Sequence, residues 1–505
     1  MVQLREELAA ASVDLFVAPG LQDDSRRGGD LSRKAPSIRA DQIRHLAPAS
    51  RNVLLHEDSQ PRVGPRLDGV DQGAVEIEDD RAGSGQRDEW LGHRSTIPAM
   101  ASEFARHWTL DPGVDFLNHG SFGAAPRSVM AAQQTWRDRI EAEPVRFFAR
   151  DYEAALDEAR RTLGDLVGAD SDDLAFVPNA TAGTNAVLRS LRFAPGDELL
   201  TTDHAYNAAK NTLEYVAARD QARVVITPVP FPIESPDEVV EAILAAVTPQ
   251  TRLALIDHIT SASALVFPIE GLVRELAARG IESLVDGAHA PGMLPLRINQ
   301  IGAAYYVGNL HKWVCAPKGT GFLWVRPDRQ EAIRPLAISH GANSPRPGRS
   351  RFREEFDWTG TADPSAYLAV PHAIRFCEGL LDGGWQALQA RNHAMAMAGA
   401  QLLRDALGSL PAAPEEMLGS MISVPLPLET RPGRVQGIAL YDDPLHANLI
   451  DRGIQVMVTP WPPRPDGSPW RRVVRISAAA YNDLEQYHRL AQALPAALAA
   501  ASAAA

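Results

Sequence analysis

The sequence predicts an α/β fold, with a mainly parallel sheet in a large domain and a smaller α+β domain after it. Two observations predict this fold. Between about residues 116 and 362, short apolar runs alternate with amphipathic stretches of helical length. Continuous apolar runs are typical of parallel strands, because crossover helices cover both faces of their sheet. After about residue 362 the composition becomes helical, and short apolar runs return only toward the C-terminus.

The predicted elements follow one another in a regular order. The stretches 173–191 and 197–219 each indicate strand, turn and helix. Further strands are predicted in ARVVITPVP, TRLALIDHIT, IESLVDGAHA, AAYYVGNLHKW and TGFLWV, and helices between them in PDEVVEAILAAV and IEGLVRELAARG. In the small domain we predict helix over 366–407 and mixed elements over 433–441, 446–458 and 471–482.

Composition divides the chain into regions. Residues 1–99 are rich in Arg, Asp and Gly and have few apolar groups to offset the entropy of ordering, so we expect them to be disordered or loosely attached. A sharper hypothesis is that Met100 is the natural start. We then expect an N-terminal arm over 100–125, a large domain over 126–362, a small domain over 363–495 and an Ala-rich tail over 496–505.

Charge and cysteine content exclude several classes of function. The net charge of -13 and the pI near 5.6 argue against a nucleic-acid partner, which would require a basic surface. The two cysteines, Cys315 and Cys377, provide neither a disulfide framework nor a zinc-binding pattern, so we expect no metal. No apolar run reaches membrane-spanning length, and we expect a soluble, cytoplasmic protein that binds no membrane.

A stretch of small residues after the first predicted strand could bind phosphate. Asn179, Ala180 and Thr181 lie where that strand gives way to a helix. Ligands collect at the carboxyl ends of parallel strands, and backbone N–H groups at a helix N-terminus favour an anion. The alternative is an ordinary Asn or Thr cap on the helix.

An acid and an amine follow two neighbouring predicted strands. Asp286 ends the run IESLV, His289 comes three residues later, and Lys312 follows the run YYVGN. A buried, desolvated lysine has a lowered pKa and becomes a nucleophile that can form a Schiff base with a carbonyl cofactor. Asp286 alone could be a helix cap, a metal ligand or the partner of a ring nitrogen, and Lys312 could be a surface charge.

These features together fit pyridoxal 5'-phosphate. This cofactor needs a lysine for its aldehyde, an acid for its pyridinium nitrogen and a cradle for its phosphate. No GxGxxG motif follows a first strand, which argues against a nicotinamide dehydrogenase.

Seven ordered blocks between about residues 104 and 495 carry a family resemblance. The chain resembles the class V aminotransferase-like, fold type I pyridoxal-phosphate enzymes, and among them the isopenicillin N epimerase group. The resemblance implies a seven-stranded sheet, a small-molecule amino-acid substrate and a homodimer. The blocks are DFLNHGSFGAAP, FVPNATAGTNAVL, TTDHAYNA, VDGAHAPG, GNLHKWVCAPKGTGFLWV, WTGTADPSAYLAV and RISAAAYN.

The resemblance assigns roles around the cofactor ring. Lys312 resembles the Schiff-base lysine, Asp286 the acid that pairs with the pyridine nitrogen, and His289 the hydrogen-bond partner of the ring oxygen. His204 matches the residue that stacks on the ring, although Tyr206 is close enough to compete.

The resemblance also implies a phosphate site. His311 and Asn309 lie where a His and a Ser usually hold the phosphate, and Asn309 departs from that pattern. Thr181 and the Ala180 amide resemble the rest of the cradle. Thr361 resembles the residue that reaches across a dimer interface to the neighbour's phosphate.

Substrate contacts follow from the same comparison. Arg475 resembles the arginine that grips the α-carboxylate, and a strand-edge ion pair is the alternative. Asn118, His119 and Gly120 resemble the segment that lines the substrate pocket, and His119 could instead be a packed structural histidine. His258 lies near the cofactor face by analogy. We expect the segments 118–124, 143–150 and 340–356 to shape the substrate pocket. The arginines of the last two segments could recognise an acidic side chain or form a solvated loop.

The expected reaction is epimerisation at the Cα of an amino acid, with Lys312 as the base that removes the proton and His204 or Tyr206 as the acid on the opposite face. The alternatives are a C–S or other β-elimination lyase, an aminotransferase, and an inactive relative that only binds a ligand. In the resembling superfamily, cysteine desulfurases carry a nucleophilic Cys on a loop ahead of the substrate-binding arginine. The corresponding stretch here, 456–472, contains no Cys, so the resemblance argues against persulfide-forming desulfuration.

Overall fold

The computed structural model describes residues 102–428, 443–461 and 472–504. The expectations for residues 1–99 and for the segment 433–441 lie outside these residues, as does most of the Cys-free stretch after residue 461.

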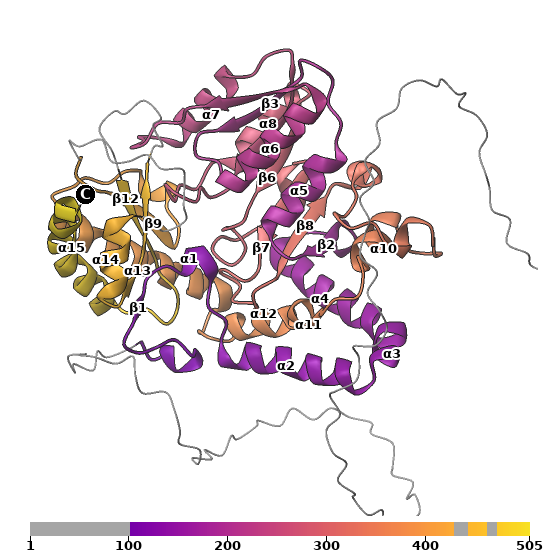
Figure 1. Cartoon of the computed structure of the whole chain (residues 1–505), viewed down its shortest axis with the longest axis horizontal. Helices are drawn as coiled ribbons and strands as arrows, with labels where there is room; N and C mark the ends of the chain where they lie inside the picture. The colour runs from indigo at the N-terminus through magenta and orange to yellow at the C-terminus, as the bar shows by residue number, and fades with distance from the viewer. Residues whose placement is uncertain (1–101, 429–442, 462–471, 505) are drawn as a thin grey trace, which may run out of the picture. The chain divides into compact units, whose positions relative to one another are not determined.

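A seven-stranded sheet forms the centre of the large domain, in the order β2-β8-β7-β6-β5-β3-β4 (Figure 1). β8 runs antiparallel to both of its neighbours, and the other neighbouring pairs are parallel. The prediction of a mainly parallel sheet is therefore confirmed. The strands are β2 (Leu174–Val177), β3 (Glu198–Thr202), β4 (Arg223–Thr227), β5 (Thr251–Asp257), β6 (Glu282–Asp286), β7 (Tyr305–Asn309) and β8 (Gly321–Val325).

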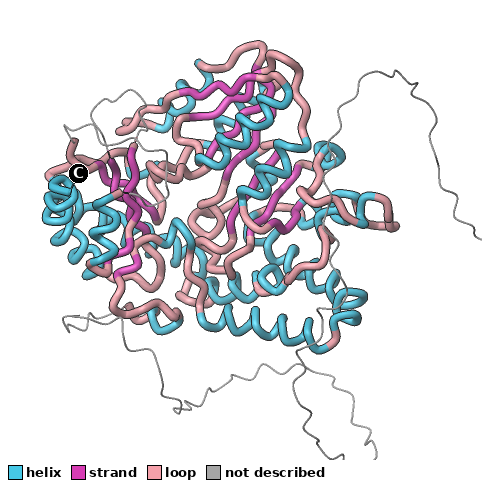
Figure 2. Tube along the Cα trace, viewed as in Figure 1, coloured by secondary structure: helices cyan, strands magenta, loops and turns pink. Residues whose placement is uncertain are grey.

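Both faces of this sheet are buried, as its uninterrupted apolar strands require. Along β5, Ala254 and Ile256 face one apolar core, whereas Leu253 and Leu255 face another. The first face is covered by α4 (Tyr152–Val167), α7 (Pro236–Ala245) and α8 (Ile269–Ala278), and the second by α5 (Ala180–Ser190), α6 (Asn207–Asp220) and α10 (Arg351–Asp357) (Figure 2).

The C-terminal part forms a second core around the antiparallel sheet β11-β12-β9. β9 (Met421–Pro425), β11 (Met457–Pro460) and β12 (Arg472–Ser477) pack against α13 (Gly384–Leu407), α14 (Pro444–Asp451) and α15 (Leu484–Ala504). By contrast, α11 (Ser365–Leu368) and α12 (Val370–Glu378) belong to the core of the large domain, where they contact α4 and α2 (Arg127–Ala142).

The N-terminal arm connects the two cores. β1 (Asp115–Phe116) pairs in parallel with β10 (Ile454–Gln455) of the C-terminal part. The one-turn helix α1 (His119–Phe122) follows at once and lies between the two cores (Figure 1). The remaining short elements are η1 (Ala105–His107), α3 (Pro144–Arg146), the π-helix η2 (Phe147–Asp151), η3 (Ser171–Asp173), α9 (Ile298–Ile301), η4 (Pro327–Ala332), η5 (His340–Ala342) and η6 (Glu415–Met417).

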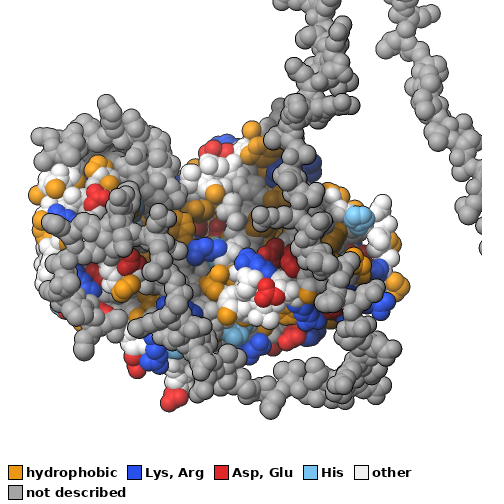
Figure 3. All heavy atoms as spheres, turned by 60° about the horizontal axis from the view of Figure 1, so that its bottom comes forward, with side chains coloured by type: hydrophobic (Ala, Val, Ile, Leu, Met, Phe, Trp, Pro, Cys, Tyr) orange, Lys and Arg blue, Asp and Glu red, His pale blue; other side chains and the backbone are white. Residues whose placement is uncertain are grey.

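Among the described helices, none is long and apolar enough to cross a membrane. Figure 3 shows acidic and basic side chains interspersed on the face that it presents.

Candidate active site

The acid and the amine meet at one edge of the sheet. β6 ends at Asp286, and Lys312 follows the end of β7 by three residues. These two strands are parallel neighbours, so their carboxyl ends share an edge. Both side chains are buried, and each affects the pKa of the other.

The Lys312 amine is tuned for nucleophilic chemistry. Its Nζ lies 3.2 Å from Nε2 of His289. Burial, with the nearby positive charge of Arg475, lowers the pKa of Lys312 to about 7, while Asp286 raises it. Burial and Lys312 hold the pKa of His289 well below its usual value, so this imidazole is neutral. Much of the amine is therefore unprotonated near neutral pH.

Two buried polar groups indicate a ligand with complementary atoms. Nδ1 of His289 has no hydrogen-bond partner among the described residues. Asp286 Oδ1 accepts a hydrogen bond from the Ala288 N–H at 3.0 Å, but burial raises the pKa of this carboxyl. An added cation beside Asp286 would favour its ionised form. A protonated pyridine nitrogen and a ring oxygen fit these two needs.

The phosphate cradle differs in detail from the expectation. Asn179 caps α5 by accepting from the Ala182 N–H at 2.9 Å. The Ala180 N–H donates instead to Asn309 Oδ1 at 2.8 Å, so Asn309 already occupies this amide. The contact leaves Nδ2 of Asn309 to donate to an anion, beside Thr181 at the start of α5.

His311 lies next to this cradle. Its Nδ1 donates to the carbonyl oxygen of Thr320 at 3.0 Å, which leaves Nε2 as its second polar atom. Burial lowers the pKa of His311 to about 4. A phosphate near Nε2 would favour the protonated, donating form of this ring.

His204 and Tyr206 have different surroundings. His204 is buried, with Nδ1 2.6 Å from Ser263 Oγ and Nε2 3.1 Å from the carbonyl oxygen of Val229. Its ring packs edge-on against Trp461, with centroids 4.4 Å apart. Tyr206 is 43% exposed at the start of α6. This arrangement favours Tyr206 over His204 for a role that needs an accessible ring.

Arg475 on β12 is 1% exposed and bridges three segments. Its Nη1 donates to the carbonyl oxygen of Ser261 at 2.6 Å and to its Oγ at 3.3 Å. Its Nη2 donates to Asn118 Oδ1 at 3.1 Å and to Ser121 Oγ at 2.8 Å. The guanidinium thus lies between α1 and the loop after β5, on the side from which it lowers the Lys312 pKa.

The segment 118–120 is tightly packed. His119 Nε2 donates to the carbonyl oxygen of Lys312 at 2.9 Å, and its Nδ1 lies 2.8 Å from Tyr481 Oη. Both ring nitrogens of His119 therefore have a partner within the protein. A Cβ at Gly120 would lie 2.6 Å from Met421 Sδ and 3.6 Å from Arg475 Nη2, so a larger residue there would require the Met421 side chain to shift.

Other candidates have partners of their own, although the His258 backbone N–H donates to the main-chain oxygen of Asp286 at 2.8 Å. His258 Nδ1 is 2.9 Å from Tyr306 Oη in the sheet core, and Thr361 is exposed in the described single chain. Arg146 is exposed and pairs with Glu143. Three arginines of the 340–356 segment make ion pairs with acids of α4, whereas Arg351 pairs with Glu355 of its own helix; the three are Arg346 with Glu153, Arg349 with Glu153 and Asp157, and Arg353 with Asp157.

Three residues near the site were not anticipated from the sequence, namely Ser261, Ser263 and Tyr481, whereas Ser121 belongs to the expected pocket segment 118–124. Ser121 lies inside the NHGSFG block, and the two loop serines lie in the stretch TSAS directly after β5. A run of small hydroxyl residues after a strand that ends at the site was the available signal. Tyr481 had no local signal, because its partner is 362 residues away.

Comparisons with known proteins show the family to which this chain is similar. The profile of the Aminotransferase class-V family matches residues 122–431. The isopenicillin N epimerase of Streptomyces clavuligerus is 35% identical, over 77% of this chain and 96% of its own. That of Amycolatopsis lactamdurans is 36% identical over 76% and 96%. A probable chloroplastic L-cysteine desulfhydrase of Arabidopsis thaliana is 33% identical over 78% and 84%.

Solved structures share the fold at lower identity. A mutant of C-DES, with glycine covalently linked to its pyridoxal-phosphate cofactor, superposes with a TM-score of 0.61 at 21% identity, over 75% of this chain and 96% of that one. The Escherichia coli cysteine desulfurase CsdA gives a TM-score of 0.61 at 19% identity, over 80% and 99%.

Proposed function

The chain belongs to the aminotransferase class V family of pyridoxal-phosphate enzymes, and on this premise we propose that it is an amino-acid epimerase. The proposed reaction rests on the similarity to two isopenicillin N epimerases, which are 35% and 36% identical to the chain over 96% of their own lengths. The substrate is then an amino acid, or a small molecule that bears one.

The residues around Lys312 would hold pyridoxal 5'-phosphate. Lys312 would bond its aldehyde, Asp286 would pair with its ring nitrogen, and His289 would meet its ring oxygen through Nδ1. Its phosphate would lie at the start of α5, against Thr181, Asn309 Nδ2 and His311 Nε2. When bound, the cofactor withdraws electrons from the substrate Cα and so acidifies the Cα proton.

The protein's own groups then direct the reaction. Arg475 would hold the α-carboxylate and so fix the orientation of the substrate Cα–H bond toward the Lys312 amine. The Lys312 amine, with a pKa of about 7, removes the Cα proton. His289 lies 3.2 Å from that amine and is neutral, so it orients Nζ without repelling the amine when it becomes charged.

Epimerisation also requires an acid on the opposite face of Cα. We assign this role to Tyr206, because His204 has both ring nitrogens engaged within a group of aromatic side chains. The phenol of Tyr206 is half exposed, and its backbone N–H donates to the buried Asp257 beside Asp286.

The first test combines spectroscopy with a product assay. Purified protein should show a visible cofactor band that borohydride fixes on Lys312, located by peptide mapping. L-Amino acids and peptides with an amino-acid terminus are then incubated in D₂O. Epimerisation predicts deuterium at Cα together with the D-isomer, and a Lys312→Ala variant should lose both. Deuterium incorporation with retained configuration would reject the epimerase proposal but keep the cofactor assignment.

C–S lysis is the second candidate, because L-cysteine desulfhydrases are 31–33% identical to the chain. The same site would serve: after the Cα proton leaves, a β-sulfur substituent could depart. Sulfide and pyruvate from L-cysteine, with no D-isomer, would select this reaction. A 2-oxo acid formed only in the presence of an amino acceptor would select transamination.

We further propose a cytoplasmic homodimer. Thr361 is exposed in the single chain, on the segment that in the resembling enzymes reaches the neighbour's phosphate. Light scattering should give twice the chain mass, and Thr361→Ala should weaken cofactor binding. A fully active monomer would reject the dimeric site.

A further inference from the structure

Arg475 is held on two sides by acceptors of different kinds. On one side, Nη1 donates to the main-chain oxygen of Ser261 at 2.6 Å. On the other, Nη2 donates to two side-chain oxygens of the arm, from Asn118 and Ser121. These oxygens are neutral, so a carboxylate would be a stronger acceptor for the same N–H groups.

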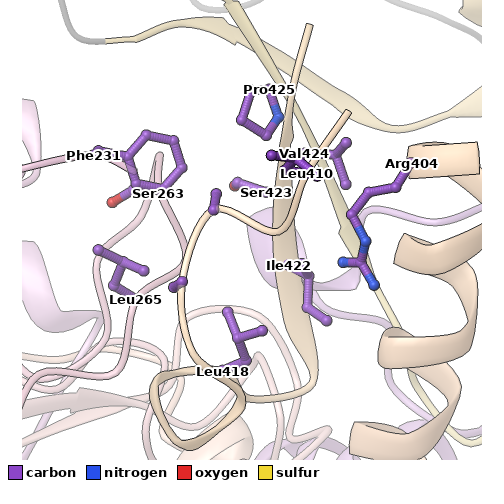
Figure 4. Close-up of a pocket in the computed structure, with 12 residues that line it drawn as sticks. Phe231, Ser263, Leu265, Arg404, Leu410, Leu418, Ile422, Ser423, Val424 and Pro425 are labelled. Carbon is purple, nitrogen blue, oxygen red and sulfur yellow. The ribbon is translucent and has the colours of Figure 1, made fainter. Parts of the chain in front are cut away.

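The Ser261 side is fixed by the fold. Its loop continues into Ala262, whose carbonyl oxygen accepts from Ser423 Oγ on β9 at 2.6 Å, and into Ser263, which contacts Thr260 and His204. Figure 4 shows Ser263 and Leu265 on one wall of a narrow crevice and β9 on the other. A contact anchored through main-chain atoms and a second strand does not yield readily to a ligand.

The Ser121 side can move at low cost. Ser121 Oγ donates to Asn118 Oδ1 at 2.7 Å, so its lone pairs face Arg475 Nη2. Asn118 is 5% exposed, whereas Ser121 is only partly buried. Rotation about one side-chain bond would remove the hydroxyl from Nη2 without moving the backbone.

We propose that Ser121 is a gate on the carboxylate site: its hydroxyl occupies, on Arg475, the place of one oxygen of the substrate α-carboxylate and must rotate away when substrate binds. This inference rests on the proposed function of Arg475 and names a residue that sets affinity for it. The gate keeps the guanidinium hydrogen-bonded while the site is empty, and every carboxylate must compete with it for the same N–H groups.

The direction in which one substitution changes the Kd for a carboxylate tests the gate. Propionate, which has a carboxylate but no amine, is titrated calorimetrically into the holoenzyme. Ser121→Ala removes the competing hydroxyl, so the Kd for propionate should fall about fivefold. Ser121→Thr retains a hydroxyl and should leave the Kd within about twofold of the wild type. Uncharged propionamide should bind no better to Ser121→Ala than to the wild type.

The contrary results are distinct. If Ser121 only supports Arg475, Ser121→Ala will raise the Kd for propionate or leave it unchanged, and the gate is then rejected. Absence of propionate binding to both proteins also rejects it. The proposed function is tested in a separate experiment. Glycine or methylamine is added to the holoenzyme, and the change in the visible cofactor band is recorded. If glycine leaves the band unchanged while propionate follows the predicted order, the proposed function fails and the gate stands.

Discussion

Nε2 of His119 lies 2.9 Å from the carbonyl oxygen of Lys312, across 193 residues of sequence. The same ring packs on Trp313, with centroids 4.9 Å apart, and accepts a hydrogen bond from Tyr481 on Nδ1. His119 therefore fixes the backbone that carries the reactive amine. Because Ser121 lies two residues further along α1, one turn of helix contacts both Lys312 and Arg475.

Removing this anchor should impair turnover more than cofactor capture. His119→Ala leaves the Lys312 carbonyl with only its hydrogen bond from the Cys315 N–H at 2.9 Å among those described. Because a misplaced amine loses reactivity steeply, we expect kcat to fall at least about tenfold. His119→Gln can still donate from its amide nitrogen and should recover part of the loss.

Tyr481→Phe is the matched control, since it leaves Nε2 of His119 in place. Steady-state kinetics and borohydride trapping of Lys312 check the prediction. Equal losses in His119→Ala and His119→Gln would show that packing, rather than the hydrogen bond to Lys312, is what matters.

Cofactor uptake should depend on pH through Lys312. Its pKa is lowered to about 7, mainly by burial, so the nucleophilic neutral amine is gained as the pH rises through that value. The rate at which apoprotein takes up pyridoxal phosphate should therefore rise between about pH 6 and 8 and then level off.

Asp286→Asn removes a negative charge that raises the Lys312 pKa, so the midpoint should move to lower pH. Stopped-flow absorbance measures both profiles, with Lys312→Ala as the blank. A midpoint near about 10, the ordinary lysine value, would contradict the buried, desolvated amine.

The roles of Tyr206 and His204 can be distinguished by one pair of variants. Tyr206→Phe should reduce D-isomer formation about 100-fold while Cα deuterium exchange continues, because only the second-face acid is lost. His204→Gln should change both reactions together, since it disturbs the packing with Ser263 and Trp461. NMR of the substrate in D₂O reports both quantities. Loss of exchange in Tyr206→Phe would place the phenol on the Lys312 face.

The sequence predicts the strand ends well and the partners of the site residues poorly. Asp286 and Lys312 could be placed because a buried strand ends at a defined residue, and its polar successor must lie at the sheet edge. The occupation of the Ala180 amide by Asn309, and of His119 by Lys312 and Tyr481, depends on contacts across 129 to 362 residues. Neither periodicity nor spacing encodes such contacts.

The dependence on long-range contacts also explains why the role of the arginines in the 340–356 segment could not be predicted. From sequence, a run of Arg in a loop is equally consistent with a substrate contact and with solvent. The fold decides between them, because α10 lies beside α4, whose face carries Glu153 and Asp157. Arg346, Arg349 and Arg353 thus join the 340–356 segment to α4.

Arg160 of α4 provides the stability prediction. It is 1% exposed and pairs with Asp157 at 2.9 Å and with the buried Asp357 of α10. Leaving a buried charge without its partner costs about 3–5 kcal/mol. In Arg160→Met the cost is smaller, because Arg349 lies 3.2 Å from Asp357 and still pairs with it. We therefore expect the free energy of unfolding to fall by about 2 kcal/mol. Adding Asp357→Leu removes the stranded carboxylate and should recover part of that loss. Urea denaturation of the single and double variants measures the coupling, and strict additivity would show that the pair contributes nothing of its own.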